Sequence, residues 1–276
     1  MRSDDEGRRT ADVIFPRAGG SGEEAEGVGV LSGQGALVFG ASSGIGRATA
    51  VALARAGAAV VVAARTGPAL EQVAAQIRSE GGRADAVVVD VAVREQVDAA
   101  VDRVRALWDA LDIVVNAAGT NVPRRRLDVL SQADWDELIR VNLSGAFHTI
   151  QAALPPMRDR RSGLIVQVSS VSGRWGDTSG AAYQASKHGV IGLCQATMFE
   201  ERRNGIRVTA VLPGLTDTPI LQRRSEPPPR SVLDQALQPE DVAAACVFLA
   251  SLPARSYVPE LIMLPPQLQC VGLTAI

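Results

Sequence analysis

The amino-acid sequence predicts an α/β fold in which helices cover both faces of a parallel β-sheet. From Gly35 onward, short apolar runs alternate with segments of helical pattern. Strands that alternate with helices form right-handed βαβ units, whose strands are parallel. The apolar runs are rich in Val and Ile and are continuous, which is typical of strands buried on both faces.

The elements follow one another in a regular order. The first run, "ALVFG" at 36–40, is expected to be a buried strand, and the small residues after its glycines indicate a helix. The later runs are interpreted in the same way. The predicted strands span residues 36–40, 58–65, 84–90, 111–119, 163–170, 206–214 and 260–265. The predicted helices span residues 45–56, 68–79, 93–108, 131–158, 181–204 and 239–251.

The first 33 residues differ from the rest of the chain. They are rich in glycine and charge and poor in aliphatic side chains. Such a composition buries too little apolar surface to offset the entropy lost on ordering. We therefore expect a disordered N-terminal arm over residues 1–33 and one domain over residues 34–276, without internal repeats.

The composition excludes several classes of partner. The net charge of −2 and the pI of about 5.8 give no bulk attraction for nucleic acid or for an anionic membrane. No apolar run reaches the roughly 18 residues of a membrane span, and the charged start is not a signal peptide. Three scattered cysteines fit a reducing compartment. We expect a cytoplasmic protein without nucleic-acid or membrane partners.

We expect no metal site. The cysteines at 194, 246 and 270 lack the spacing of metal ligands and are interpreted as packing residues. Neither His148 nor His188 has a cysteine, carboxylate or second histidine at ligand spacing. We therefore assign neither histidine a metal-binding or acid–base role.

Three glycines, Gly40, Gly44 and Gly46, stand between the first strand and the first helix. Gly40 permits a tight turn, Gly44 lets the backbone approach a ligand, and Gly46 lets the helix pack closely on the sheet. The helix N-terminus then offers free N–H groups and the positive end of its dipole to a pyrophosphate. The turn therefore favours dinucleotide binding over an ordinary glycine-rich turn.

Further motifs follow the glycine turn in a characteristic order. They are "GASSGIG" at 40–46, "NAAG" at 116–119, Asn142, "VSS" ending at Ser170, "YQASK" at 183–187 and "LPG" at 212–214. On these motifs the chain resembles the short-chain dehydrogenase/reductase family from about Gly35 to Pro265. The resemblance implies a single Rossmann-like, three-layer domain that binds a dinucleotide and is catalytic, with a seven-stranded parallel sheet of order 3-2-1-4-5-6-7.

The resemblance implies the catalytic set Asn142, Ser170, Tyr183 and Lys187. Tyr183 and Lys187 are four residues apart, which puts them on one face of a helix. The pKa of a free tyrosine is about 10, and we expect the neighbouring ammonium to lower it. Tyr183 would act as general acid/base, Ser170 would hold the substrate oxygen, Lys187 would also bind the nicotinamide ribose, and Asn142 would hold a water that links Lys187 to solvent.

The end of the second strand bears on the choice of cofactor. An NAD-binding domain places an acidic residue there, but this chain has Ala64 followed by Arg65, whose guanidinium suits a 2′-phosphate. The glycine turn lacks the family's other basic residue. NADP(H) is therefore favoured over NAD(H), the alternative being that Arg65 is a solvent-facing loop residue. The expected cofactor-binding residues are Gly40, Ser42, Ser43, Gly44, Ile45, Gly46, Arg65, Asp90, Val91, Asn116, Ala117, Gly119, Tyr183, Lys187, Pro213, Gly214 and Thr218.

The resemblance implies an oxidoreductase that moves a hydride between NADP(H) and a small carbonyl or alcohol substrate. Arginines 124–126 are interpreted as a solvated charge run rather than as contacts to an anionic substrate. Trp175 is expected either to wall the pocket or to give simple hydrophobic cover. The alternative function is a catalytically silent nucleotide-binding or scaffolding protein on the same fold.

Two further expectations come from the family pattern. The family usually has threonine where this chain has Phe39, and the exchange is expected to loosen the glycine turn or weaken cofactor binding without removing a catalytic group. The helices at 131–158 and 181–204 pair across a two-fold axis in the family, which implies a homodimer or homotetramer. The final segment lacks the family's glycine pair, so tetramer contacts through the last strand are in doubt and at least a dimer is expected.

Overall fold

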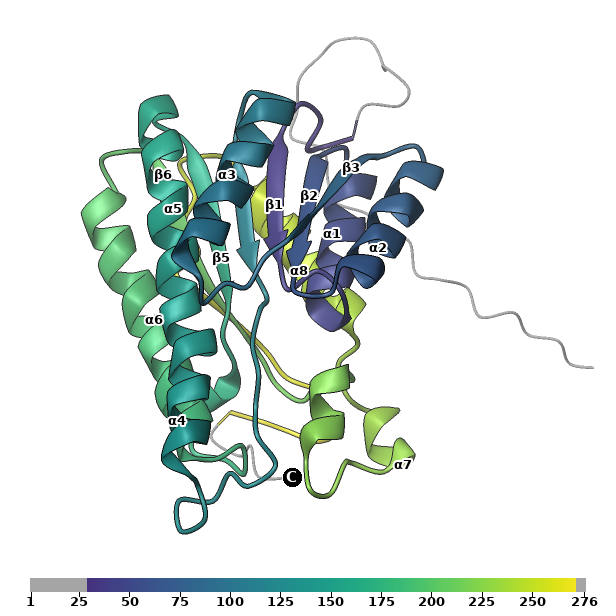
Figure 1. The fold of residues 1–276 in the computed structure, drawn as a ribbon, viewed down its shortest axis with the longest axis vertical. Helices are drawn as coiled ribbons and strands as arrows, with labels where there is room; N and C mark the ends of the chain where they lie inside the picture. Colours follow the sequence, from purple (N-terminus) through teal and green to yellow (C-terminus); the bar gives the residue numbers. More distant parts are fainter. Residues whose placement is uncertain (1–28, 272–276) are drawn as a thin grey trace, which may run out of the picture.

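The computed structural model describes residues 29–271, and they form one seven-stranded parallel sheet (Figure 1). The strand order is β3-β2-β1-β4-β5-β6-β7, as predicted, and every neighbouring pair is parallel. The strands are β1 (Gly35–Phe39), β2 (Ala59–Ala64), β3 (Arg83–Val88), β4 (Ile113–Asn116), β5 (Gly163–Val168), β6 (Ile206–Pro213) and β7 (Glu260–Met263).

Helices cover both faces of the sheet, which confirms the three-layer expectation (Figure 1). One face carries α1 (Gly44–Arg55), α2 (Gly67–Ser79) and α8 (Pro239–Ser251). The other face carries α3 (Arg94–Trp108), α5 (Gly145–Arg160) and α6 (Ala181–Glu201), with α4 (Gln132–Leu138) leading into α5. No described helix has the length and apolarity needed to cross a membrane.

The continuous apolar strands contribute side chains to two separate hydrophobic cores, one on each face of the sheet. Along β1, Leu37 and Phe39 join the core under α3, α5 and α6, whereas Ala36 and Val38 join the core under α1, α2 and α8. Because strand side chains alternate between faces, only an uninterrupted apolar strand can fill both cores. The edge strand β3 carries polar residues such as Asp85, whose carboxylate pairs with Arg103 at 2.7 Å.

Phe39 belongs to the core and leaves the backbone connection at the turn in place. Its side chain is fully buried in the core under α3, α5 and α6. Its carbonyl oxygen accepts a hydrogen bond from the Ala117 N–H at 3.0 Å, which ties the end of β1 to the segment that follows β4. At the position where the family has a threonine, the Phe39 side chain packs in the core and its backbone keeps the connection to the segment after β4.

The structure differs from the sequence-based expectation in three places. The predicted helix 131–158 is divided by a π-helix at Ile139–Ser144 and ends at Arg160. Residues 29–33 were assigned to the disordered arm but form a turn, because the fully buried Leu31 packs in the core and its N–H donates to the Ala56 carbonyl. The rest of the predicted arm, residues 1–28, lies outside the described residues.

The third difference is the segment after β6, for which no helix was predicted. It contains a 3₁₀-helix at Pro219–Arg223 and the short α7 at Arg230–Leu233. Leu215, Leu221 and Leu233 bury their side chains together in a small core of their own. The segment is therefore a folded unit, and it lies beyond the carboxyl ends of the strands in Figure 1.

The role of Phe39 can be tested by restoring the residue usual in the family. Phe39→Thr should lower the free energy of unfolding by about 3 kcal/mol, because it deletes a fully buried aromatic ring and leaves a cavity. Urea unfolding followed by circular dichroism measures the change. Phe248→Thr, at a partly exposed phenylalanine of α8, is the matched control. Equal losses in the two variants would contradict a packing role for Phe39.

Candidate active site

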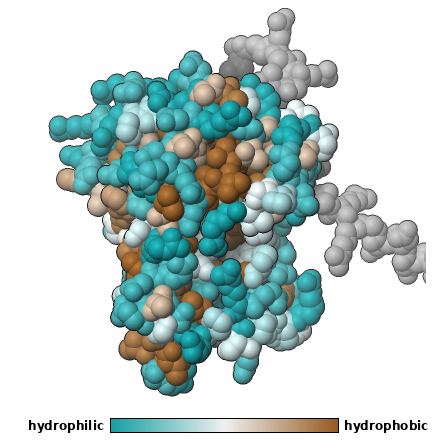
Figure 2. Space-filling view, viewed as in Figure 1, coloured by the Kyte–Doolittle hydropathy of each residue, from teal (hydrophilic) through white to brown (hydrophobic). Residues whose placement is uncertain are grey.

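A cavity of about 440 Å³ opens at the carboxyl ends of the strands, between the sheet and the folded segment after β6. Figure 2 shows a largely hydrophilic face that is hollowed at the level where the strands of Figure 1 end. Open α/β sheets bind ligands at this edge, where the chain leaves neighbouring strands toward opposite faces. β1 and β4 are such neighbours, since β1 leads to α1 and β4 leads to α4 and α5.

The glycine turn has the geometry that the sequence predicted. Gly40 adopts φ +74°, and a Cβ there would lie 2.6 Å from the Ala118 nitrogen. A Cβ on Gly46 would lie 2.3 Å from the Gly40 carbonyl oxygen, so the start of α1 packs directly on the turn. The Ser43 side chain makes no capping hydrogen bond. The first N–H groups of α1 are thus left facing the cavity for an anion.

The cavity brings together nearly all of the predicted site residues. Every residue expected to bind cofactor lines it except Asn116, and Ser170 lines it too. Asn116 is buried behind the wall, where its side-chain amide donates to Gln167 at 2.8 Å and its oxygen accepts from the Ala118 N–H at 3.1 Å. Its observed contacts connect β4 to β5 and shape the segment that lines the cavity.

Two of the residues expected to bind the cofactor lie just after the ends of neighbouring strands. Arg65 is exposed at the end of β2, and its guanidinium makes no hydrogen bond or ion pair with another described residue. Asp90, after β3, is held in place by the Ala92 N–H at 3.0 Å and by Arg140 at 3.4 Å. Arg65 is therefore available to a ligand, whereas Asp90 is fixed by the protein.

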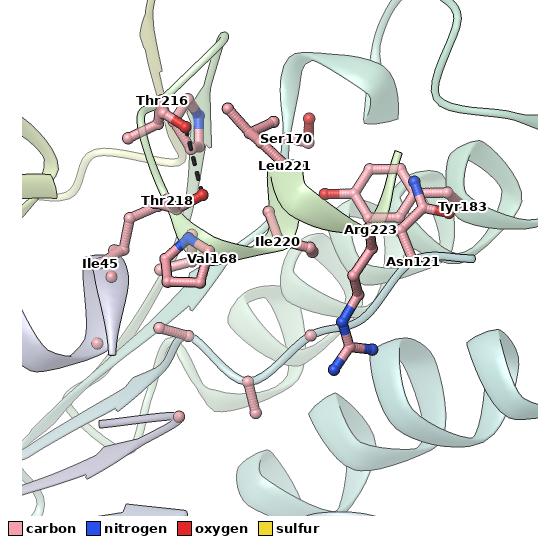
Figure 3. A pocket seen from close by; sticks show the side chains of 18 of the residues that line it. Ile45, Asn121, Val168, Ser170, Tyr183, Thr216, Thr218, Ile220, Leu221 and Arg223 are labelled. Carbon is pink, nitrogen blue, oxygen red and sulfur yellow. Dashed lines mark hydrogen bonds between the residues drawn. The ribbon is translucent and has the colours of Figure 1, made fainter. Parts of the chain in front are cut away.

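Tyr183 and Ser170 face the same part of the cavity. In Figure 3 their hydroxyl groups lie on one side of the pocket, although Tyr183 comes from α6 and Ser170 from the turn after β5. The Tyr183 ring packs against a small cluster that includes Val122 and Leu138. The Ser170 hydroxyl donates to Ser172 at 3.1 Å, so a carbonyl oxygen bound between Ser170 and Tyr183 would receive two hydrogen bonds when the Ser170 O–H turns toward it.

Burial, not the neighbouring lysine, sets the pKa of Tyr183. Burial of the phenol raises its pKa to about 12, and the hydrogen bond with Ser170 only partly opposes this shift. The nearby Asp177 carboxylate adds to the rise. The pKa of Tyr183 is therefore raised, whereas we expected the neighbouring Lys187 to lower it. At neutral pH the phenol is protonated and can donate.

Lys187 is the only lysine in the chain, and it is almost fully buried. Its Nζ lies 5.6 Å from the centre of the Tyr183 ring and donates to the Val168 carbonyl oxygen at 2.9 Å. Burial lowers the pKa of Lys187 to about 8. The remaining donor positions of the ammonium group are free to contact a ligand in the cavity.

Asn142 does not line the cavity but supports its wall from the π-helix. The side-chain oxygen accepts from the Thr120 N–H at 2.8 Å, and the amide donates to the Thr120 carbonyl at 3.0 Å and to Ser186 at 3.1 Å. Both N–H groups of the amide are thus used by protein partners. A π-turn inside a helix often marks a functional site, and here it brings Asn142 to the strand end after β4.

Several lining residues were missed or misjudged from the sequence. Asp177, Arg223 and Arg224 line the cavity beside Tyr183 without having been assigned to the site. Arg125, assigned to a solvated charge run, also lines the cavity, whereas its neighbours at 124 and 126 are exposed and pair with carboxylates. Trp175 is not among the lining residues.

Comparison with known proteins agrees with this geometry. The family model described as short chain dehydrogenase matches residues 34–229. This chain belongs to the short-chain dehydrogenase family. The chain shares the family's fold, and the comparisons support NAD(P)-dependent oxidoreduction.

The relatives cover most of the chain. The 3-oxoacyl-[acyl-carrier-protein] reductase FabG of Thermotoga maritima is 36% identical over 80% of this chain and 92% of its own length. The 3-oxoacyl-[acyl-carrier-protein] reductase of Synechocystis is 37% identical over 83% and 93%. A metagenomic short-chain oxidoreductase in complex with NADP has a TM-score of 0.74 at 34% identity, covering 86% of this chain and 98% of that protein.

Among the described residues, no group of three or more histidine, cysteine or acidic side chains is arranged to hold a metal ion. His148 contacts the Val91 carbonyl oxygen and His188 the Gln184 carbonyl oxygen, each at 2.9 Å. The described cysteines are free thiols, of which Cys194 and Cys246 are buried in the two cores.

The buried lysine predicts a pH-dependent stability. The unfolded chain, with a lysine pKa near 10.5, binds more protons than the folded chain between pH 8 and 10.5. The Lys187 contribution to the free energy of unfolding should therefore rise with pH across this window, by about 3 kcal/mol in all. Urea unfolding of wild type and Lys187→Met at several pH values measures it.

The variant serves as the control, because the buried cysteines are present in both proteins and the shift of Tyr183 acts mainly above pH 10. The difference in unfolding free energy between wild type and Lys187→Met should change with pH only in this window. A pH-independent difference would show that Lys187 keeps its ordinary pKa in the folded protein.

Proposed function

We propose that this protein is an NADP(H)-dependent carbonyl reductase of the short-chain dehydrogenase family that acts on small molecules. One observation carries the proposal: Tyr183 presents a protonated phenol beside the Ser170 hydroxyl and the Lys187 ammonium in one cavity. Reduction of a carbonyl requires a proton donor at the oxygen, and the Tyr183 phenol carries a proton at neutral pH. The free thiols fit the expected cytoplasmic location.

The mechanism assigns each side chain a separate task. The nicotinamide, when bound, supplies the hydride to the carbonyl carbon. Ser170 donates a hydrogen bond to the carbonyl oxygen and holds it beside Tyr183. Tyr183 then transfers its phenolic proton to that oxygen, which gives the alcohol. Lys187 stabilises the resulting phenolate with its positive charge until a proton from solvent replaces the one that was lost.

The cavity fits a dinucleotide with a 2′-phosphate. The open N–H groups at the start of α1 suit a pyrophosphate, and any Cβ at Gly40 or Gly46 would clash with backbone. Arg65 supplies an unpaired guanidinium at the end of β2, where an NAD-binding protein has an acid. The structural relative that was solved with NADP supports the same preference.

The alternative, a catalytically silent nucleotide-binding protein, uses the same fold but needs no proton donor. The relatives named as 3-oxoacyl reductases support carbonyl reduction instead. The two functions are separated by the oxidation of NADPH in the presence of a panel of ketones and aldehydes. Binding of NADPH without turnover on any of them would favour the silent protein.

The catalytic role of Tyr183 predicts a specific loss. Tyr183→Phe removes the phenolic proton but keeps the ring that packs against Val122 and Leu138. Turnover should fall roughly 10²-fold or more, the usual scale for a positioned acid. Initial rates measure turnover, and NADPH fluorescence titration measures cofactor binding, which should stay nearly unchanged. Tyr257→Phe, outside the cavity, is the control, and near wild-type turnover of Tyr183→Phe would refute the assignment.

Cofactor choice is tested at Arg65. Arg65→Ala removes one or two charge-assisted hydrogen bonds to a 2′-phosphate, so the Kd of NADPH should rise about tenfold to a hundredfold. The Kd of NADH, which has no phosphate there, should barely change. Arg55→Ala, whose side chain pairs with Glu80 away from the cavity, is the control. Equal effects on both cofactors would make Arg65 an ordinary loop residue.

We also propose that the chain forms at least a homodimer through α5 and α6. A shallow groove between these helices is lined by Phe147, Leu154 and Leu193, and Phe147 and Phe199 are 42% and 68% exposed. Light scattering at micromolar concentration should give twice the chain mass of 28.9 kDa, and Phe147→Glu should shift it toward one chain. A monomeric wild type would overturn this proposal.

A further inference from the structure

Two arginines from different loops line the cavity on the side of Tyr183, which is the half proposed to bind the substrate (the substrate half). Arg125 comes from the segment between β4 and α4, and Arg224 follows the 3₁₀-helix after β6. Both line the cavity, and both are half-buried. A Cβ on Gly180, the residue before α6, would lie 2.5 Å from the Arg125 carbonyl oxygen. The Arg125 loop is therefore packed against the start of the helix that carries Tyr183.

Neither guanidinium has a carboxylate partner among the described residues. Arg125 reaches only the Arg223 carbonyl oxygen, at 3.5 Å, and Arg224 forms no ion pair with a described carboxylate. Nearby arginines outside the cavity behave differently: Arg126 pairs with Asp128 at 3.0 Å, and Arg174 pairs with Glu260. The lack of a carboxylate partner therefore distinguishes these two cavity arginines from the two outside it.

The local electrostatics leave this pair in need of an anion. The pKa of Arg125 is lowered by burial and by the charge of Arg224, and burial also lowers the pKa of Arg224. The Asp177 carboxylate opposes these shifts in both arginines, but it also accepts hydrogen bonds from the hydroxyls of Ser172 and Ser179 and from the Ser179 N–H at 2.9 Å. A buried charge costs free energy unless it is paired, so a bound anion would relieve both guanidiniums.

Tyr183 lies within reach of both charges. The two guanidiniums act on the Tyr183 phenol electrostatically, and each stabilises its ionised form. An anionic group bound by the two arginines would therefore lie close to the reacting carbonyl, so that one substrate molecule could carry both groups. Leu215, Ile220 and Leu221 line the same cavity and offer apolar contact to a short carbon chain. The guanidinium fork matches a carboxylate in shape and charge.

We propose that Arg125 and Arg224 bind the carboxylate of the substrate, so that the substrates are short-chain oxo acids. The proposal rests on the carbonyl reductase activity proposed above and names its substrate class. The two guanidiniums bind the carboxylate, and the oxo group lies between Ser170 and Tyr183. The carbon chain that joins the carboxylate to the oxo group contacts the apolar wall. Reduction then converts the oxo acid to a hydroxy acid.

Paired substrates test the proposal. The probes are 2-oxobutanoate, 3-oxobutanoate and 4-oxopentanoate, each compared with its methyl ester, which keeps the carbonyl and removes the charge. For at least one acid, wild type should show a KM at least tenfold below that of the ester. Arg125→Met and Arg224→Met should each raise that KM at least tenfold and change the KM of the ester far less. Arg126→Met, at the exposed neighbour, should change neither.

A binding measurement separates this proposal from the proposed activity. Calorimetric titration of the acids into Tyr183→Phe loaded with NADP⁺ should show binding that Arg125→Met and Arg224→Met weaken at least tenfold, even if no carbonyl is reduced. Equal binding of acids and esters, no binding of any acid, or unchanged acid binding in both arginine variants would overturn the oxo-acid proposal. Turnover of neutral ketones alone would leave the reductase activity standing and refute this substrate class.

Discussion

The site depends on the close approach of two backbone segments at the ends of β1 and β4. The turn after β1 touches the segment after β4 so closely that Gly40 admits no Cβ, and Phe39 and Ala117 share a hydrogen bond there. From this point the chain departs toward α1 on one face and toward α4 on the other. The crevice between the two departures is the cavity, so its position follows from the sheet order alone.

Desolvation dominates the chemistry of this crevice. The same burial that raises the pKa of Tyr183 to about 12 lowers that of Lys187 to about 8. Both shifts disfavour charge, and they leave the phenol neutral and the ammonium easy to deprotonate. Ser170, Ser172 and Asp177 form a hydrogen-bonded chain behind the phenol, with the Ser172 hydroxyl 2.5 Å from Asp177. A ligand that brings charge into the cavity will therefore change both pKa values.

The fold was largely predictable because it follows from local patterns. Continuous apolar strands and helical spacing locate the sheet, and the motif order gives the strand order. The π-helix at 139–144 was not predictable, since it depends on Asn142 finding the backbone of Thr120 far along the chain. The pKa of Tyr183 was also misjudged, because a sequence shows the lysine four residues away but not the depth at which both side chains lie.

The substrate half was the least predictable part, for a related reason. Within "RRR" at 124–126, all three side chains look alike in the sequence, yet only Arg125 turns into the cavity, because the neighbouring charges find surface partners. The segment after β6 holds itself together through Leu215, Leu221 and Leu233, apart from the two main cores. The pairing of Thr216 with Leu237 closes the segment on itself, and Gln269, whose side chain accepts from the Leu215 N–H at 2.7 Å, fastens it to the domain.

That separate core divides the site into a half proposed to bind the cofactor and a half proposed to bind the substrate, and the two halves have different constraints. The cofactor half is built on strand ends and cannot change without disturbing the sheet, because Gly40 and Gly46 pack against backbone. The substrate half is built on a unit whose apolar residues pack mainly with one another. Side chains such as Arg224 can therefore be exchanged at small cost to the main cores, which lets one fold keep its hydride chemistry while its substrate changes.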